Sequence, residues 1–127
     1  MNEREKIQSA ILDAIEAMNA ALDELRAAAY GLAVADHAYR QRKAQEYLHA
    51  SVQRREDGKL LTEDHRNAVV DLACNAEMLA CRMAEARREA ARESWRALQT
   101  QISAGQSLLS AERAEATALR YGQTTGA

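Results

Sequence analysis

The sequence contains no proline at any of its 127 positions. Average usage of about 5% would give roughly six prolines, and each one inside a helix costs about 3 kcal/mol because it removes a hydrogen bond and clashes with the preceding turn. A chain without proline can therefore form long helices without interruption. Phenylalanine is also absent and aromatic residues reach only 4%, so the apolar surface consists mainly of small and aliphatic side chains. These features predict an all-α fold.

Apolar residues recur at spacings of three and four on both sides of a polar stretch around Gly58, which indicates two helices with an apolar stripe each. The upstream stripe is Ile7, Ile11, Ile15, Met18, Leu22, Leu25, Ala29 and Leu32, and the downstream one is Val69, Leu72, Ala76, Leu79, Met83, Ala86, Ala90, Leu98, Ile102, Gly105 and Leu109. We predict a single domain over residues 1–127, with a helix over about 3–56, a turn over about 57–61, a helix over about 62–120 and a flexible tail over 121–127.

The predicted turn carries its own signals. Asp57-Gly58 is the sole Asp-Gly pair, and glycine suits the left-handed conformation just past a helix end. Thr62, followed by two acidic residues, has the character of an N-cap. A short connection makes the two helices antiparallel, so the chain is expected to form a long, coiled-coil-like helical hairpin. Gly31 and Gly105 are the positions at which either helix would bend.

The segment 68–81 is apolar over most of its circumference, and a single partner helix cannot cover such a surface. This predicts a homo-oligomeric helical bundle built on the second helix. The expected interface residues are Val69, Val70, Leu72, Cys74, Met78, Leu79, Cys81 and Met83. The two cysteines lie about 10 Å apart along one helix, too far for a disulfide within it, and are interpreted as reduced packing residues.

The sequence offers no pattern for catalysis or for a metal. The three histidines are dispersed, and the carboxylates Glu85, Glu89 and Glu93 are each followed three residues later by an arginine, as on a solvated helix face. No enzyme, cofactor, metal or small-molecule substrate is expected. The charged first residues predict no signal peptide, and no apolar run is long enough for a membrane span, so a cytoplasmic location and no membrane partner are expected.

Two segments are candidates for binding. Basic residues interleave with tyrosines in the first helix, a pattern typical of single-stranded nucleic-acid binding through phosphate contacts and base stacking. The candidate nucleic-acid-binding residues are Tyr39, Arg40, Arg42, Lys43, Tyr47, Arg54 and Arg55. Packing of the tyrosines in the helix–helix seam is the alternative. In the second helix, Trp95, Gln99, Ser103 and Gln106 are the candidate partner-binding residues.

A helix with Lys-Ala and tyrosine is followed by a turn and then by a long helix with a Leu-Gln-Thr and Gln-Ser-Leu signature. The positions that form this pattern are Tyr39, Lys43, Ala44, Tyr47, Leu98, Gln99, Thr100, Ser103, Gln106, Ser107 and Leu109. In this pattern the chain resembles a group of small helical early proteins of tailed bacteriophages. The layout is also similar to that of UvsY-type recombination mediators. This resemblance implies an oligomeric accessory protein of DNA recombination or replication in the cytoplasm of a bacterial host. The implied partners are single-stranded DNA and a phage recombinase or a single-strand-binding protein.

The near-neutral charge of −2 favours a second class of function. In that alternative, the chain is a helical protein–protein interaction module, such as an adaptor or an inhibitor of a host or defence protein, and has no nucleic-acid contact. The arginine-rich segment 82–96 of the second helix has an excess charge of only two and is interpreted as a solvated helix face whose charges pair with one another.

Overall fold

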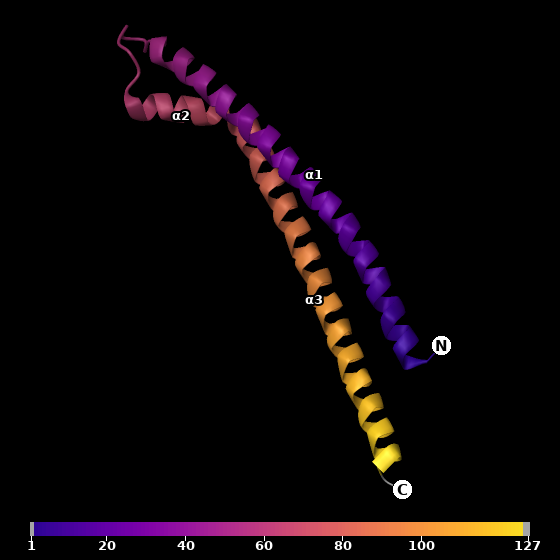
Figure 1. Cartoon of the computed structure of the whole chain (residues 1–127). Helices are drawn as coiled ribbons and strands as arrows, with labels where there is room; N and C mark the ends of the chain where they lie inside the picture. The colour runs from indigo at the N-terminus through magenta and orange to yellow at the C-terminus, as the bar shows by residue number, and fades with distance from the viewer. Residues whose placement is uncertain (1, 126–127) are drawn as a thin grey trace. The chain divides into compact units, whose positions relative to one another are not determined.

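The computed structural model describes residues 2–125, with side chains through Gly122. Within this range the chain forms three helices, α1 (Glu3–Val52), α2 (Glu63–Ala73) and α3 (Asn75–Thr125) (Figure 1). The β-type pairing in the described residues is one isolated bridge, between Arg54 and Leu60. The predicted all-α helical hairpin is confirmed.

The helix ends differ from the predicted ones. α1 ends at Val52, about four residues early, because the backbone beyond it pairs across the connecting loop instead of continuing the helical ladder. The irregular segment 53–62 is therefore longer than the predicted turn. α3 continues to Thr125, beyond the predicted end at about residue 120. Residues 126–127 lie outside the described residues.

The loop 53–62 closes on itself. The Arg55 amide donates to the Lys59 carbonyl at 2.7 Å, and the Gly58 amide donates to the Arg55 carbonyl at 2.9 Å. The guanidinium of Arg54 donates to the Gly58 carbonyl at 2.9 Å. Gly58 has a φ of 82°, the left-handed conformation predicted for it, but it closes this turn and does not cap α1. The helix end and the left-handed glycine are thus separate features.

The second helical region begins as predicted and is interrupted where no glycine stands. The Thr62 hydroxyl accepts a hydrogen bond from the His65 amide at 3.3 Å, which confirms the N-cap. Cys74, with φ −96° and ψ 8°, then separates α2 from α3. Gly31 and Gly105 lie inside continuous helices, because a cost of about 1 kcal/mol is small against the surrounding helical turns.

The described chain divides into two compact units. Unit 1 combines the first part of α1, up to Leu25, with α3 from Ala91 onward. Unit 2 comprises residues 26–90, which hold the rest of α1, the loop, α2 and the start of α3. In each unit the α1 part runs antiparallel to the α3 part (Figure 1).

Unit 1 is a two-helix seam with a coiled-coil period. Its less exposed positions alternate at spacings of four and three, a heptad pattern typical of a left-handed coiled coil. On α1 they include Ile7, Ile11, Ala14, Met18, Ala21 and Leu25, and on α3 they include Ala91, Trp95, Leu98, Ile102, Gly105 and Leu109. Small residues recur within both rows, which allows the two backbones to approach closely.

Unit 2 has a core that three segments share. Ala50 of α1, Val70 of α2 and Cys74 at the helix break are each about 1% exposed, and Tyr39 packs against them. α2 leaves the direction of α3 at Cys74 and lies over the end of α1 (Figure 1). The break at Cys74 therefore brings α2 back onto α1.

The larger residues of the downstream apolar stripe face away from the rest of the chain in unit 2. Leu72, Leu79 and Met83 are exposed, whereas Cys74 and Cys81 are buried. The inner row instead uses small residues, because a thiol or a methyl group lets α3 pack closely on α1. The bulkier side chains are left on the outer side of the helix.

Candidate functional site

Tyr39 and Lys43 of the proposed nucleic-acid-binding segment contact each other and other residues of the chain. Tyr39 is half-buried and packs against the core of unit 2. The Lys43 ammonium lies 5.7 Å from the centre of the Tyr39 ring, within the range of a cation–π contact. One face of this ring is therefore already in use, and stacking of a base on it would require the contact to open.

The two arginines of this segment form ion pairs on α1. Arg40 Nε lies 3.1 Å from the Asp36 carboxylate, and Arg42 Nη2 lies 3.1 Å from the Glu46 carboxylate. Arg42 also approaches Glu77 of α3 at 3.9 Å. Exposed pairs of this kind contribute about 0–1 kcal/mol, so they neutralise the local charge without holding the arginines rigidly.

Tyr47 fixes the position of α2 on α1. Its hydroxyl donates to the side-chain carbonyl of Asn67 at 2.9 Å. The ring remains partly exposed, and the hydrogen bond orients it along the contact between α1 and α2. Tyr39 thus packs against the core of unit 2, whereas Tyr47 is 38% exposed and contacts α2 through its hydroxyl.

Arg54 and Arg55 shape the loop. Arg54 donates to the Gly58 carbonyl, and Arg55 pairs with Asp57 at 2.9 Å. With His65 they line one shallow hollow, which also contains the carboxylates of Glu56 and Asp57. Arg54 and Arg55 therefore lie in the loop after α1, apart from Arg40 and Arg42 on that helix, and have acidic residues beside them.

The eight predicted interface residues do not share one surface. Val70, Cys74 and Cys81 are buried by the chain itself, which removes them from any face that another copy could contact. Val69 and Met78 are half-buried, and Leu72, Leu79 and Met83 are exposed. The outer side of α3 in unit 2 carries a charge-free strip at spacings of three and four. This strip consists of Ala76, Leu79, Met83, Ala86 and Ala90, and we call it the outer strip of α3.

Burial raises the pKa of both thiols above its ordinary value. Glu77 adds to this shift at Cys74, and Asp36 adds to it at Cys81. A thiol with a raised pKa stays protonated near neutral pH and is a poor nucleophile. The arrangement favours packing over reactivity.

The predicted partner-binding residues lie along one side of α3 in unit 1. Gln99, Ser103 and Gln106 are exposed at spacings of four and three, so they share a face. Trp95 is half-buried at the edge of this face and takes part in the helix–helix seam. The structure thus brings the three polar residues together and gives Trp95 a packing role.

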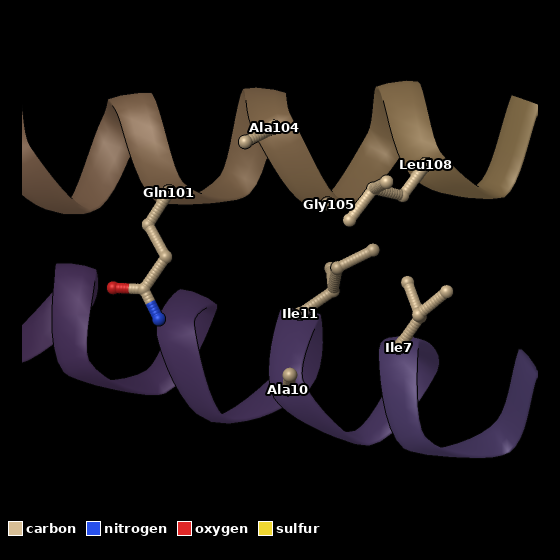
Figure 2. A pocket seen from close by; sticks show the side chains of 7 residues that line it. All are labelled: Ile7, Ala10, Ile11, Gln101, Ala104, Gly105 and Leu108. Atoms are coloured by element: carbon tan, nitrogen blue, oxygen red, sulfur yellow. The ribbon is translucent and has the colours of Figure 1, made fainter. Parts of the chain in front are cut away.

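A hollow of about 240 Å³ lies between the helices of unit 1 (Figure 2). Its lining residues are Ile7, Ala10, Ile11, Gln101, Ala104, Gly105 and Leu108. The Ile11 side chain points toward the Gly105 backbone, and a methyl group on Gly105 would lie 2.7 Å from Ile11 Cγ1. The lining contains no ionisable group, and the close contact between Ile11 and Gly105 bounds the hollow on one side.

Sequence reasoning missed the outer side of α1. Tyr30, Val34, Leu48 and Val52 are all exposed in unit 2. The signal was present as a second apolar spacing on the same helix, but the stripe of Ile and Leu residues upstream was the stronger pattern. We define the outer row of α1 as Tyr30, Val34, Gln41, Leu48 and Val52.

Over residues 2–125, no cluster of three or more His, Cys, Asp or Glu side chains is placed to hold a metal ion. In that same range, no helix has the combination of length and apolar character needed to cross a bilayer. No protein-family model, no curated protein and no solved structure matches the chain.

Proposed function

We propose that this chain is a non-enzymatic helical interaction module that binds an amphipathic helix of a partner protein in unit 2. The observation that carries this proposal is the outer strip of α3, where Leu79 and Met83 are exposed on a face without charge. An apolar face at helical spacing is the kind of surface that a partner helix covers. Leu72 of α2 is exposed as well and extends the apolar surface available in this unit.

The state of the basic residues favours this function over nucleic-acid binding. Arg40, Arg42 and Arg55 each have a carboxylate partner, and Lys43 lies over the Tyr39 ring. Binding phosphates there would replace contacts that the chain already makes. Leu79 and Met83 of the apolar strip, in contrast, are 56% and 65% exposed among the described residues.

The test is affinity capture from the bacterial host with purified chain as bait. We would compare the wild type with Leu79→Arg/Met83→Arg, and use Glu85→Arg as a control on another face of the same helix. A protein retained by the wild type and the control, but lost with the double variant, supports the proposal. Identical retention by all three baits contradicts it. Circular dichroism of each bait confirms that the helices are intact.

The second candidate is single-stranded DNA binding by a phage accessory protein of recombination or replication. Two observations favour it: the Arg40 side chain is 78% exposed despite its ion pair, and Arg54, Arg55 and His65 line one hollow. A surface ion pair is weak enough for a phosphate to compete. The candidate partners are then single-stranded DNA, a phage recombinase or a single-strand-binding protein.

Fluorescence anisotropy of a labelled oligonucleotide at low and at physiological salt tests this candidate. Phosphate contacts predict affinity that falls steeply with salt. The variant Arg40→Glu/Arg42→Glu/Lys43→Glu should then lose binding while keeping its helicity. Equal binding by wild type and variant removes this segment as the DNA site, and no binding at low salt removes the candidate function.

A further inference from the structure

The outer row of α1 occupies a narrow arc of the helix. At about 100° per residue, its four apolar members lie within about 20° of Gln41 around the helix axis. They are between 51% and 74% exposed. The residues that α1 turns toward the inside of unit 2, such as Leu32 and Tyr39, lie on the opposite side. α1 therefore carries a second apolar face that nothing in unit 2 covers.

No ionised side chain interrupts this row over about six turns of helix. On the same side of α1, the exposed residues that flank the row include Ala38, Ala44 and Gln45, whose side chains carry no charge. The nearest charges lie to either side, and they are the pairs Asp36–Arg40 and Arg42–Glu46. Because each pair is neutral in total, the row can meet a surface identical to itself with little net charge repulsion.

The row has a palindromic spacing. Tyr30 and Val52 are each 11 residues from Gln41, and Val34 and Leu48 are each 7 residues from it. In an antiparallel pair of identical helices with a two-fold axis at Gln41, Tyr30 lies level with Val52 of the second copy. Val34 then lies level with Leu48 of the second copy. A two-fold interface needs such self-complementarity, since the same patch serves both sides.

The residue on the axis also suits a two-fold arrangement. Gln41 would meet Gln41 of the second copy, and its amide carries both a donor and an acceptor. Each amide can donate to the other. A lysine, arginine or glutamate at this position would oppose its own charge across the axis.

We propose that the outer row of α1 binds a second copy of this chain, in antiparallel orientation about a two-fold axis at Gln41. This site differs from the outer strip of α3 assigned above to a partner protein, and it does not depend on that assignment. The row is about 33 Å long, from 22 residues at 1.5 Å each. A contact of this length predicts a dimer that dissociates on dilution.

Site-directed cross-linking tests the geometry. Gln41→Cys lies on the axis, so mild oxidation should join two copies through this position. Gln45→Cys is the matched control, because its two copies would stand about 12 Å apart along the helices, beyond the roughly 7 Å between Cα atoms that a disulfide allows. Cys74 and Cys81 are buried and common to both variants. Linked dimers with Gln41→Cys alone support the proposal. Linkage at both positions, or at neither, contradicts the antiparallel arrangement.

Sedimentation velocity over a dilution series tests the surface. Val34→Arg and Leu48→Arg should each weaken dimerisation at least about ten-fold, while circular dichroism remains unchanged. Leu79→Arg, on the outer strip of α3, should leave dimerisation unaffected. A wild type that stays monomeric at every concentration, or variants that dimerise like the wild type, overturns the proposal. The capture experiment with Leu79→Arg/Met83→Arg tests the outer strip of α3, and its outcome does not alter the dimerisation measured here. The partner-binding proposal and the dimer proposal can therefore be contradicted independently.

Discussion

The two units of this chain share α1 and α3, but unit 2 also contains α2 and is held together differently. In unit 1 the buried side chains include two alanines, Ala14 and Ala91, and the packing depends on large residues that meet small ones. Unit 2 buries Val70, Leu61 and two cysteines, and adds a hydrogen bond between α1 and α2. Unit 1 thus depends on close fit, and unit 2 on a small core with polar contacts that set its register.

The largest expected effect is in the core of unit 2. Val70→Asp places a carboxylate at a site that is 1% exposed, and we expect it to lower the free energy of unfolding by about 3 kcal/mol or more. Leu72→Asp is the matched control, because Leu72 is 80% exposed and two residues away. It should change stability by about 0.5 kcal/mol or less. Urea unfolding followed by circular dichroism measures both, and equal losses would mean that unit 2 has no such core.

A pair of glycine substitutions sharpens the comparison between the units. Gly105→Ala in unit 1 forces a methyl group to within 2.7 Å of Ile11, and overpacking of this kind costs about 1–3 kcal/mol. Gly31→Ala in unit 2 meets no atom within 4 Å and should stabilise the helix by about 1 kcal/mol. The two variants should therefore shift the unfolding midpoint in opposite directions.

Hydrogen exchange locates the Gly105 effect. Gly105→Ala should accelerate exchange in residues 2–25 and 91–122 more than in residues 26–90. Ile11→Ala, combined with Gly105→Ala, should cost less than Ile11→Ala alone because the added methyl group fills the vacated space. Additive costs would show that the two residues do not meet.

A smaller effect is expected for the polar contact of unit 2. Tyr47→Phe removes the hydrogen bond to Asn67 and should cost about 0.5–1.5 kcal/mol. Asn67→Ala in the Tyr47→Phe background should add little, since the pair is already broken. A double-mutant cycle by thermal unfolding measures this coupling, and a coupling near zero would assign the position of α2 to apolar packing alone.

The smallest effect near neutral pH comes from the thiols of unit 2. Burial raises the pKa of Cys74 and Cys81 above the ordinary value of 9.0, so the unfolded thiols ionise first as pH rises. Stability is therefore unaffected by them below pH 9.0 and falls as pH rises from there through their folded pKa values. Urea midpoints between pH 7.5 and 10 should decline less in Cys74→Ala/Cys81→Ala than in the wild type. Parallel declines would contradict the shift.

The sequence predicted the hairpin because its signals are local. The absence of proline, the Thr62 cap and the left-handed Gly58 each act within a few residues. It was harder to predict which face of α3 packs against α1. The leucine side chain is more apolar than the cysteine side chain, yet Leu79 is exposed and Cys81 is buried. Close approach of two helices favours the smaller side chain, and this preference depends on the partner helix rather than on the residue itself.

The candidate site was less predictable than the fold. Spacing placed Tyr39, Arg40 and Lys43 together correctly, but it did not show that each has a partner within the chain. Ion pairs at i, i+4 could have been anticipated for Asp36 and Arg40 from position alone. The core contact of Tyr39 could not, because it depends on where α2 returns to α1.

The loop 53–62 has a practical consequence for engineering. Its backbone bonds run between its own residues, from Arg55 to Lys59 and from Gly58 to Arg55, and its side chains fold onto the same turn. Lengthening a flexible loop adds only about 0.6 kcal/mol of closure entropy for each doubling. An epitope or a fluorescent reporter inserted between Asp57 and Gly58 would open this turn, but the broken bonds all lie within the loop, so α1 and α3 should remain intact as a scaffold for display.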